Sequence, residues 1–241
     1  MNKTSSIGLL FAALLVALGI GAGGYFIGQT MYNAKVALNT AEVKGLAERR
    51  VEADRANWTI KFANAGKYKS DIPNLYDISE KNQESIVKIL KESGFSEDEI
   101  KIGILNYSYY EYRDKDQVLV DQKHQLSGYI SVETDKVKLI DKARAKVNKL
   151  IAKGINIEDQ EPSYHFTKLN AIKPDMLKEA TKNARIAANE FAANAGVKVG
   201  GIRSARQGNF NIRDVGEEYS NSRKIEKDIR VVTTITFYLT D

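Results

Sequence analysis

Residues 43–62 read VKGLAERRVEADRANWTIKF, and this stretch decides the fold because its two halves are strand-like but out of phase. Most apolar residues occupy odd positions up to Ala53 and even positions from Ala56 onward. Alternate residues of a strand point to opposite faces, so each half predicts a half-buried strand. The change of phase needs an extra residue or a turn. We therefore expect a bulge or hairpin corner at Asp54–Arg55, with the charged residues on the solvent face.

The carboxylates of the same stretch offer a catalytic alternative. Glu48, Glu52 and Asp54 lie close together in the sequence. Residues two apart on an extended strand share a face at a spacing of about 7 Å, which some glycosidases use for paired acids. Three arginines of the stretch would hold these acids ionised and remove the raised pKa that a general acid needs. We therefore favour the structural interpretation.

The N-terminal segment predicts a membrane anchor. Residues 7–28 read IGLLFAALLVALGIGAGGYFIG, and no charged residue occurs between Lys3 and Lys35. As a helix with a rise of about 1.5 Å per residue, this segment crosses a hydrocarbon core of about 30 Å. Gly21-Ala22-Gly23 resembles the cleavage site of a secretory signal, but apolar residues resume after it. We expect an uncleaved signal anchor, with cleavage as the alternative, and an exported remainder in either case.

The rest of the chain predicts an α+β fold with a largely antiparallel sheet packed by about three helices, after the one N-terminal transmembrane helix. We assign residues 1–28 to the anchor, 29–40 to a linker and 41–241 to a single domain. Helical spacing of apolar residues followed by glycine predicts helices over residues 73–92, 135–153 and 174–194. Alternating apolar residues predict further strands over residues 100–112, 123–133, 164–169, 197–207 and 229–239.

Composition and motifs exclude several classes of function. The chain of 241 residues has no cysteine, which excludes disulfides and thiol chemistry. His124 and His165 have neither the spacing of a metal site nor a serine in a nucleophile elbow, and we expect both to face solvent or a sheet edge. The net charge of +5 is modest and interspersed, and an exported location disfavours nucleic acid. We expect no enzyme activity, no catalytic residue, no cofactor and no metal.

Two groups of residues are candidates for interaction. The predicted strand over residues 100–112 carries four tyrosines, which protein interfaces favour, although strand propensity alone is the alternative. These candidate oligomer contacts are Tyr107, Tyr109, Tyr110 and Tyr112. The second predicted helix carries a stripe of lysines for anionic lipid headgroups or acidic envelope polymers, with a solvated helix face as the default. The stripe comprises Lys138, Lys142, Lys146, Lys149 and Lys153.

The ordered series of segments resembles the SIMPL-domain family of exported bacterial proteins, the YggE-like group. The resemblance rests on Gly45 and Ala53-Asp54, on SGYISVETD at residues 127–135, and on LKEATKNARIAANEFAANAGVKVGGIRSARQG at residues 177–208. It covers roughly residues 42–239. Ala53 replaces the usual proline, so the corner is less rigid here. The resemblance implies an exported α+β protein that forms ring- or channel-like homo-oligomers, with no agreed activity and with proposed roles in envelope and oxidative-stress physiology.

Together these observations predict a membrane-anchored, envelope-exposed module that self-associates as a scaffold without catalysis. We expect it in the bacterial inner membrane with a single pass through residues 7–28 and its C-terminal domain in the periplasm, or soluble in the periplasm if the signal is cleaved. The expected partner is a second copy of the chain. The alternative function is a ring- or channel-like homo-oligomer that passes or binds small solutes or anionic envelope ligands.

Overall fold

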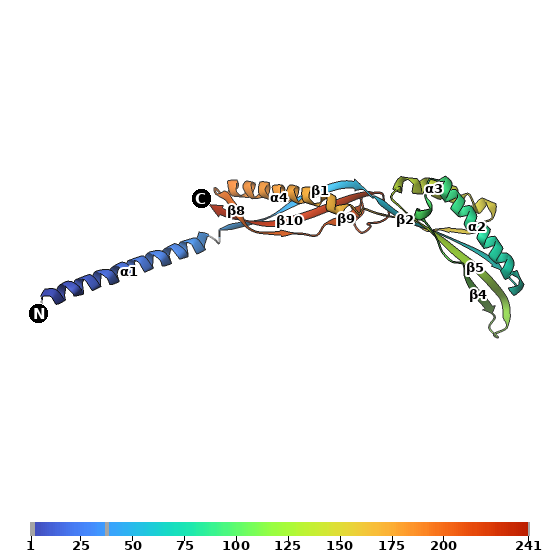
Figure 1. Cartoon of the computed structure of the whole chain (residues 1–241), viewed down its shortest axis with the longest axis horizontal. Coiled ribbons are helices and arrows are strands. Elements are labelled where there is room, and N and C mark those ends of the chain that lie inside the picture. Colours follow the sequence, from blue (N-terminus) through green and yellow to red (C-terminus); the bar gives the residue numbers. More distant parts are fainter. Residues whose placement is uncertain (1–2, 37–38, 241) are drawn as a thin grey trace. The chain divides into compact units, whose positions relative to one another are not determined.

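A computed structural model of the chain describes residues 3–36 and 39–240 (Figure 1). The helices are α1 (Lys3–Val36), α2 (Ile72–Glu92), α3 (Ile140–Asn148) and α4 (Leu169–Asn194). The strands are β1 (Thr40–Glu52), β2 (Arg55–Gly66), β3 (Ile100–Ile102), β4 (Asn106–Arg113), β5 (Leu119–Thr134), β6 (Ile157–Asp159), β7 (Ser163–His165), β8 (Lys198–Gln207), β9 (Asn211–Asp214) and β10 (Glu226–Thr240). The α+β class with antiparallel sheets, three helices and a further N-terminal apolar helix is confirmed.

Helix α1 contains a segment, Phe11–Ala34, that is apolar and long enough to cross a membrane. None of that segment is buried against the rest of the chain. The helix continues without a break to Val36, through most of the stretch that we expected to be a linker. A signal sequence near the N-terminus can also meet these criteria of length and composition.

The chain forms two compact units. The first is drawn from Met1–Ala47, Pro174–Phe210 and Arg230–Asp241, and the second from Glu48–Lys173 and Asn211–Ile229. A four-stranded sheet has the order β1-β10-β8, with β9 also paired to β10. A six-stranded sheet has the order β3-β5-β2-β6, with β4 also on β5 and β7 also on β2. Antiparallel strand pairs therefore occur in two sheets, whereas the sequence predicted a single, largely antiparallel sheet.

In the first unit α4 packs on the sheet through a stripe of small residues. The buried residues of the helix are Met176, Ala180, Ala184, Ala188 and Ala192. A side chain at Gly45 of β1 would place its Cβ 1.9 Å from the carbonyl oxygen of Ala180, so the two backbones are in direct contact. Phe191 of the same helix lies outside this stripe and is 56% exposed. The buried residues of α4 repeat every four positions, and position 191 is not among them. From Ala180 to Ala192 the helix lies so close to the sheet that the buried side chains are single methyl groups.

In the second unit α2 and α3 cover the same face of the six-stranded sheet (Figure 1). The core residues come from β2 (Trp58, Ile60, Phe62), β5 (Ile130, Val132), α2 (Ile86, Leu90) and α3 (Ile140, Ala143, Val147). These strand residues all have even numbers, as the alternation of the quoted stretch predicts for β2. The odd-numbered residues of β2 and β5 therefore form the opposite, polar face of the sheet.

The predicted corner occurs at Asp54, but it is not a hairpin. β1 ends at Glu52, β2 begins at Arg55, and the two strands belong to different sheets. The charged residues of the corner have partners: Arg50 with Asp228 (2.9 Å), Glu52 with Lys138 (2.7 Å), and the Asp54 carboxylate with the backbone N–H of Thr167 (2.7 Å). These contacts agree with the structural interpretation of the acidic residues.

Other differences from the predicted elements are local. The strand expected over residues 100–112 is interrupted after Ile102, and β4 resumes at Asn106. The second expected helix is an α-helix of nine residues flanked by two short 3-10 turns, Val137–Leu139 and Ile151–Lys153. Helix α4 begins at Leu169, five residues before Pro174. Strands β6 and β9 are three and four residues long, too short to show a clear alternation.

Candidate functional site

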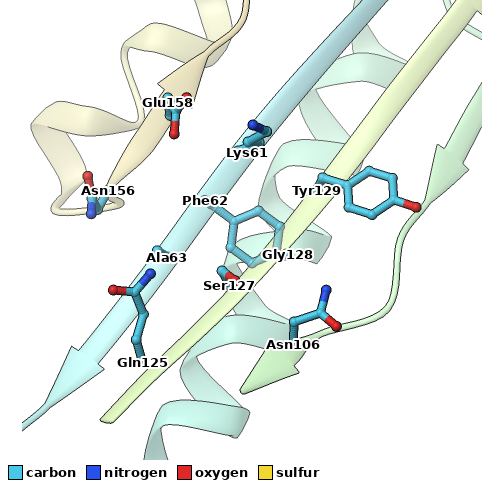
Figure 2. A pocket seen from close by; sticks show the side chains of 10 residues that line it. All are labelled: Lys61, Phe62, Ala63, Asn106, Gln125, Ser127, Gly128, Tyr129, Asn156 and Glu158. Atoms are coloured by element: carbon cyan, nitrogen blue, oxygen red, sulfur yellow. The ribbon is translucent and has the colours of Figure 1, made fainter. Parts of the chain in front are cut away.

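An open depression of about 500 Å³ lies on the polar face of the six-stranded sheet (Figure 2). Its lining residues are Lys61, Phe62, Ala63, Asn106, Gln125, Ser127, Gly128, Tyr129, Asn156 and Glu158. Figure 2 shows Glu158 and Asn156 on one side of strands β2 and β5, and Tyr129 and Asn106 on the other. The volume is within the usual range of small-molecule sites.

The register of the sheet creates the depression. Ala63 of β2 lies directly opposite Ser127 of β5, so two short side chains meet at the centre of the face. Two residues away on the same strands, Lys61 lies opposite Tyr129, and Lys61 also lies opposite Glu158 of β6. Long side chains thus surround a floor of short ones.

The ring of Tyr129 packs against the short loop, residues 103–105, that separates β3 from β4. A Cβ atom at Gly103 would lie 2.4 Å from the Tyr129 ring, so only glycine leaves room for the ring at this position. The backbone N–H of Gly103 donates to the carbonyl oxygen of Tyr129 at 2.9 Å. The Tyr129 side chain remains 44% exposed beside the depression. The structure therefore presents an accessible aromatic ring on a fixed support.

The chemistry of the lining suits binding. Lys61 supplies an ammonium group and Glu158 a carboxylate, so the two formal charges cancel. Three side-chain amides supply both donors and acceptors: Asn106, Gln125 and Asn156. Within the described residues, no group of three or more histidine or acidic side chains is arranged to hold a metal. The lining therefore offers hydrogen-bonding groups and one exposed aromatic ring, that of Tyr129.

Sequence reasoning proposed none of these residues as a binding site. The available signal was a pair of short side chains, Ala63 and Ser127, among longer ones at polar positions of two predicted strands. The signal was insufficient because strand register decides which residues lie opposite each other.

The four candidate tyrosines all lie on β4 and are between 43% and 50% exposed. Tyr107 and Tyr109 contact the same buried residue: the Tyr107 hydroxyl is 2.7 Å from Nδ1 of His124, and the Tyr109 ring stacks on the imidazole. Tyr110 and Tyr112 lie opposite Lys123 and Asp121 of β5, on the other face. The structure therefore brings two tyrosines together at His124 and separates them from the other two. The prediction that His124 faces solvent or a sheet edge is wrong, because Tyr109 covers it.

The candidate lysines remain on the surface. Lys138 lies in the 3-10 turn before α3 and pairs with Glu52. The other four are exposed along α3 and the 3-10 turn after it: Lys142, Lys146, Lys149 and Lys153. No ligand contact tests this stripe, and an anionic partner for it stays a prediction.

Residues 41–237 match the family model SIMPL, described as a protein of unknown function (DUF541). The chain belongs to the SIMPL family. The resemblance recognised from the ordered segments is thus confirmed. The description of the family assigns no activity.

Other comparisons add little to the SIMPL assignment. No curated protein matches the chain. Among solved structures, the de novo designed protein Foldit4 is 8% identical, with a TM-score of 0.24 over 44% of this chain and 93% of its own. AtUAH in complex with glyoxylate is 13% identical, with a TM-score of 0.24 over 61% of this chain and 36% of its own. An uncharacterised conserved protein from Listeria innocua is 15% identical, with a TM-score of 0.19 over 77% and 91%. These similarities are too weak to assign a function.

Hydrogen bonds lower the pKa values of two carboxyl groups of the second unit, Glu99 and Asp214, to about 2. Burial alone would raise the pKa of Glu99, but hydrogen bonds from Lys136, Thr134 and Ser96 outweigh burial and lower the pKa to about 2. Ser96 and Glu99 form a capping box at the start of a short 3-10 turn, Glu97–Glu99. The pKa of Asp214 is also lowered to about 2, because hydrogen bonds led by that from Lys227 outweigh burial.

These pKa values predict acid sensitivity of the SIMPL protein. Both folded-state values lie below the ordinary values of 4.5 and 3.8, so the stabilisation is complete above pH 4.5 and is lost as the pH falls toward 2. Trp58 is the single tryptophan and is buried in the second unit, so its fluorescence during urea unfolding reports this unit. The urea midpoint should fall below pH 4.5, and Glu99→Gln should flatten the fall. The control is Asp98→Asn, at an exposed neighbouring residue, and it should show the wild-type dependence of the urea midpoint on pH. A wild-type pH dependence in Glu99→Gln would refute the assignment of the acid sensitivity to Glu99.

Proposed function

We propose that this SIMPL protein is a membrane-anchored, envelope-exposed module that self-associates and contributes structure without catalysing a reaction. Helix α1 supports the anchor, because Phe11–Ala34 has the length and composition of a membrane span. The proposal places the chain in the bacterial inner membrane with a single pass and with both compact units in the periplasm.

The exposed tyrosine ribbon carries the self-association proposal. We use this name for β4 together with residues 119–123 of β5. β2 ends at Gly66, opposite His124, so residues 119–123 pair with β4 on one side and have no described strand on the other. Both faces of this two-stranded part carry half-exposed tyrosines, and three exposed apolar residues follow at its tip: Val118, Leu119 and Val120. Two strands without a covering layer are marginally stable in water.

A second copy of the chain is the partner that fits this ribbon. Among the described strands, β4 pairs with β5 alone, which leaves a row of backbone donors and acceptors along its other edge. Glu111 and Arg113 of β4 pair with each other at 2.8 Å, so they do not repel an approaching copy of the strand. An antiparallel edge is self-complementary around a two-fold axis, which makes the same strand of another copy a matching partner.

The mass of the full-length protein in mild detergent tests this proposal. Light scattering on a sizing column, corrected for detergent, should give a discrete oligomer for wild type. The double variant Tyr110→Lys, Tyr112→Lys should be monomeric, because lysines on an exposed edge oppose strand pairing. Tyr76→Lys replaces a tyrosine of similar exposure on α2 and should retain the oligomer. A monomeric wild type, or an unchanged mass of the double variant, would overturn the proposal.

A further inference from the structure

We propose that the depression on the six-stranded sheet is a binding site for a saccharide bearing acetamido groups. The inference goes beyond the proposed function and does not depend on self-association, because all the lining residues belong to one copy of the second unit.

The position of the site in the sheet disfavours a peptide. Its floor is formed by β2 and β5, which are interior strands with neighbours on both sides. Their backbone groups are used within the sheet, so an extended peptide cannot add to it as a further strand. Its floor is formed by the short side chains of Ala63 and Ser127, and most of the residues that line it are polar or charged. The site therefore lacks the apolar pockets that would select alternate side chains of a peptide.

The side chains present suit a sugar. A pyranose ring has one face of C–H groups and an edge of hydroxyl groups, and it needs both an aromatic surface and a surrounding set of hydrogen-bond partners. Tyr129 supplies a ring that is already immobilised against Gly103, which lowers the ordering cost of binding. The three amides of the lining can donate to and accept from an acetamido group at the same time.

The dimensions and the charge agree with this ligand. The lining residues come from β4, β5, β2 and the β6 region, which are successive neighbours in the sheet. At about 4.8 Å between strands, the site extends about 14 Å across the sheet, enough for more than one sugar ring. Lys61 and Glu158 give no net charge, so the site does not select an anion.

Isothermal titration calorimetry of the full-length protein tests the inference. The detergent must lack a sugar headgroup, because an alkyl maltoside would compete. The probe is the N-acetylglucosamine tetrasaccharide, with cellotetraose, which has hydroxyls in place of acetamido groups, as the comparison. We expect saturable binding of the probe at micromolar to millimolar concentration and binding of cellotetraose that is weaker by about tenfold or more.

Variants on one face of β5 localise the binding. Ser127→Trp fills the floor and Tyr129→Ala removes the ring, and each should weaken binding by about tenfold or more. Tyr129→Phe keeps the ring and should bind within a few-fold of wild type. Ser131→Trp introduces the same bulk on the same face outside the depression and is the matched control. Absence of saturable binding, equal loss in Ser131→Trp, equal affinity for cellotetraose, or a preference for a tetra-alanine peptide would each overturn the inference.

Discussion

Lys227→Met is expected to destabilise the second unit by about 3–5 kcal/mol, a large part of the stability of an ordinary domain. The side chains of Lys227 and Asp214 are both fully buried and form an ion pair. The Lys227 ammonium also donates to the carbonyl oxygen of Asn221 at 3.0 Å, and the Asp214 carboxylate also accepts from Ser220 and from the backbone N–H of Arg223. The ion pair therefore connects β9 to β10 and holds the loop between them through the additional hydrogen bonds. Removing the ammonium group leaves a buried carboxylate without its counter-ion.

Urea unfolding followed by Trp58 fluorescence measures this loss. Lys224→Met in the same loop is the matched control, because Lys224 pairs with Glu217 at an exposed site and should cost at most about 1 kcal/mol. The double variant Asp214→Asn, Lys227→Met removes both charges and should recover part of the stability. A wild-type unfolding midpoint for Lys227→Met would show that the pair does not stabilise the unit.

Gly45→Val is expected to break the packing of α4 on β1 in the first unit. The added Cβ would lie 1.9 Å from the Ala180 carbonyl oxygen and 2.5 Å from the Ala184 backbone nitrogen. Because these obstructing atoms are backbone atoms of a helix, rotation of a side chain cannot relieve the clash. We expect a cost of about 3 kcal/mol or more, at the upper end for overpacked cores.

Hydrogen exchange measures this effect, because the single tryptophan lies in the other unit. Amides of α4 and of residues 230–240 should lose protection in Gly45→Val, while those of β2 and β5 keep it. Gly201→Val is the matched control, since Gly201 is a strand glycine of the same unit with no atom near the added Cβ. Wild-type protection of α4 in Gly45→Val would mean that the helix adjusts without loss.

Local patterns predicted the elements whose signals are continuous along the chain. The apolar N-terminal helix α1, helix α2 and the alternation of β2 and β5 follow from runs of apolar residues at one spacing. Ser96 and Glu99 are three residues apart, and their capping box needs no contact with a distant segment. The family was also recognisable, because it depends on the order of such segments.

The candidate site and the buried ion pair depend on segments far apart in the sequence. Odd-numbered residues from 229 to 239 form one buried face of β10, and Lys227 continues that face. Its partner Asp214 lies 13 residues earlier, in the short strand β9, and no local pattern links the two.

The sequence by itself determined which residues of each strand and helix are apolar, and hence the α+β class, the apolar N-terminal helix and the family. Only the tertiary structure decided that the strands form two sheets, that Ala63 lies opposite Ser127, and that α4 touches β1 at Gly45. The physical reason is that periodicity depends on neighbours along the chain, whereas strand register and helix–sheet contact depend on which distant segments meet.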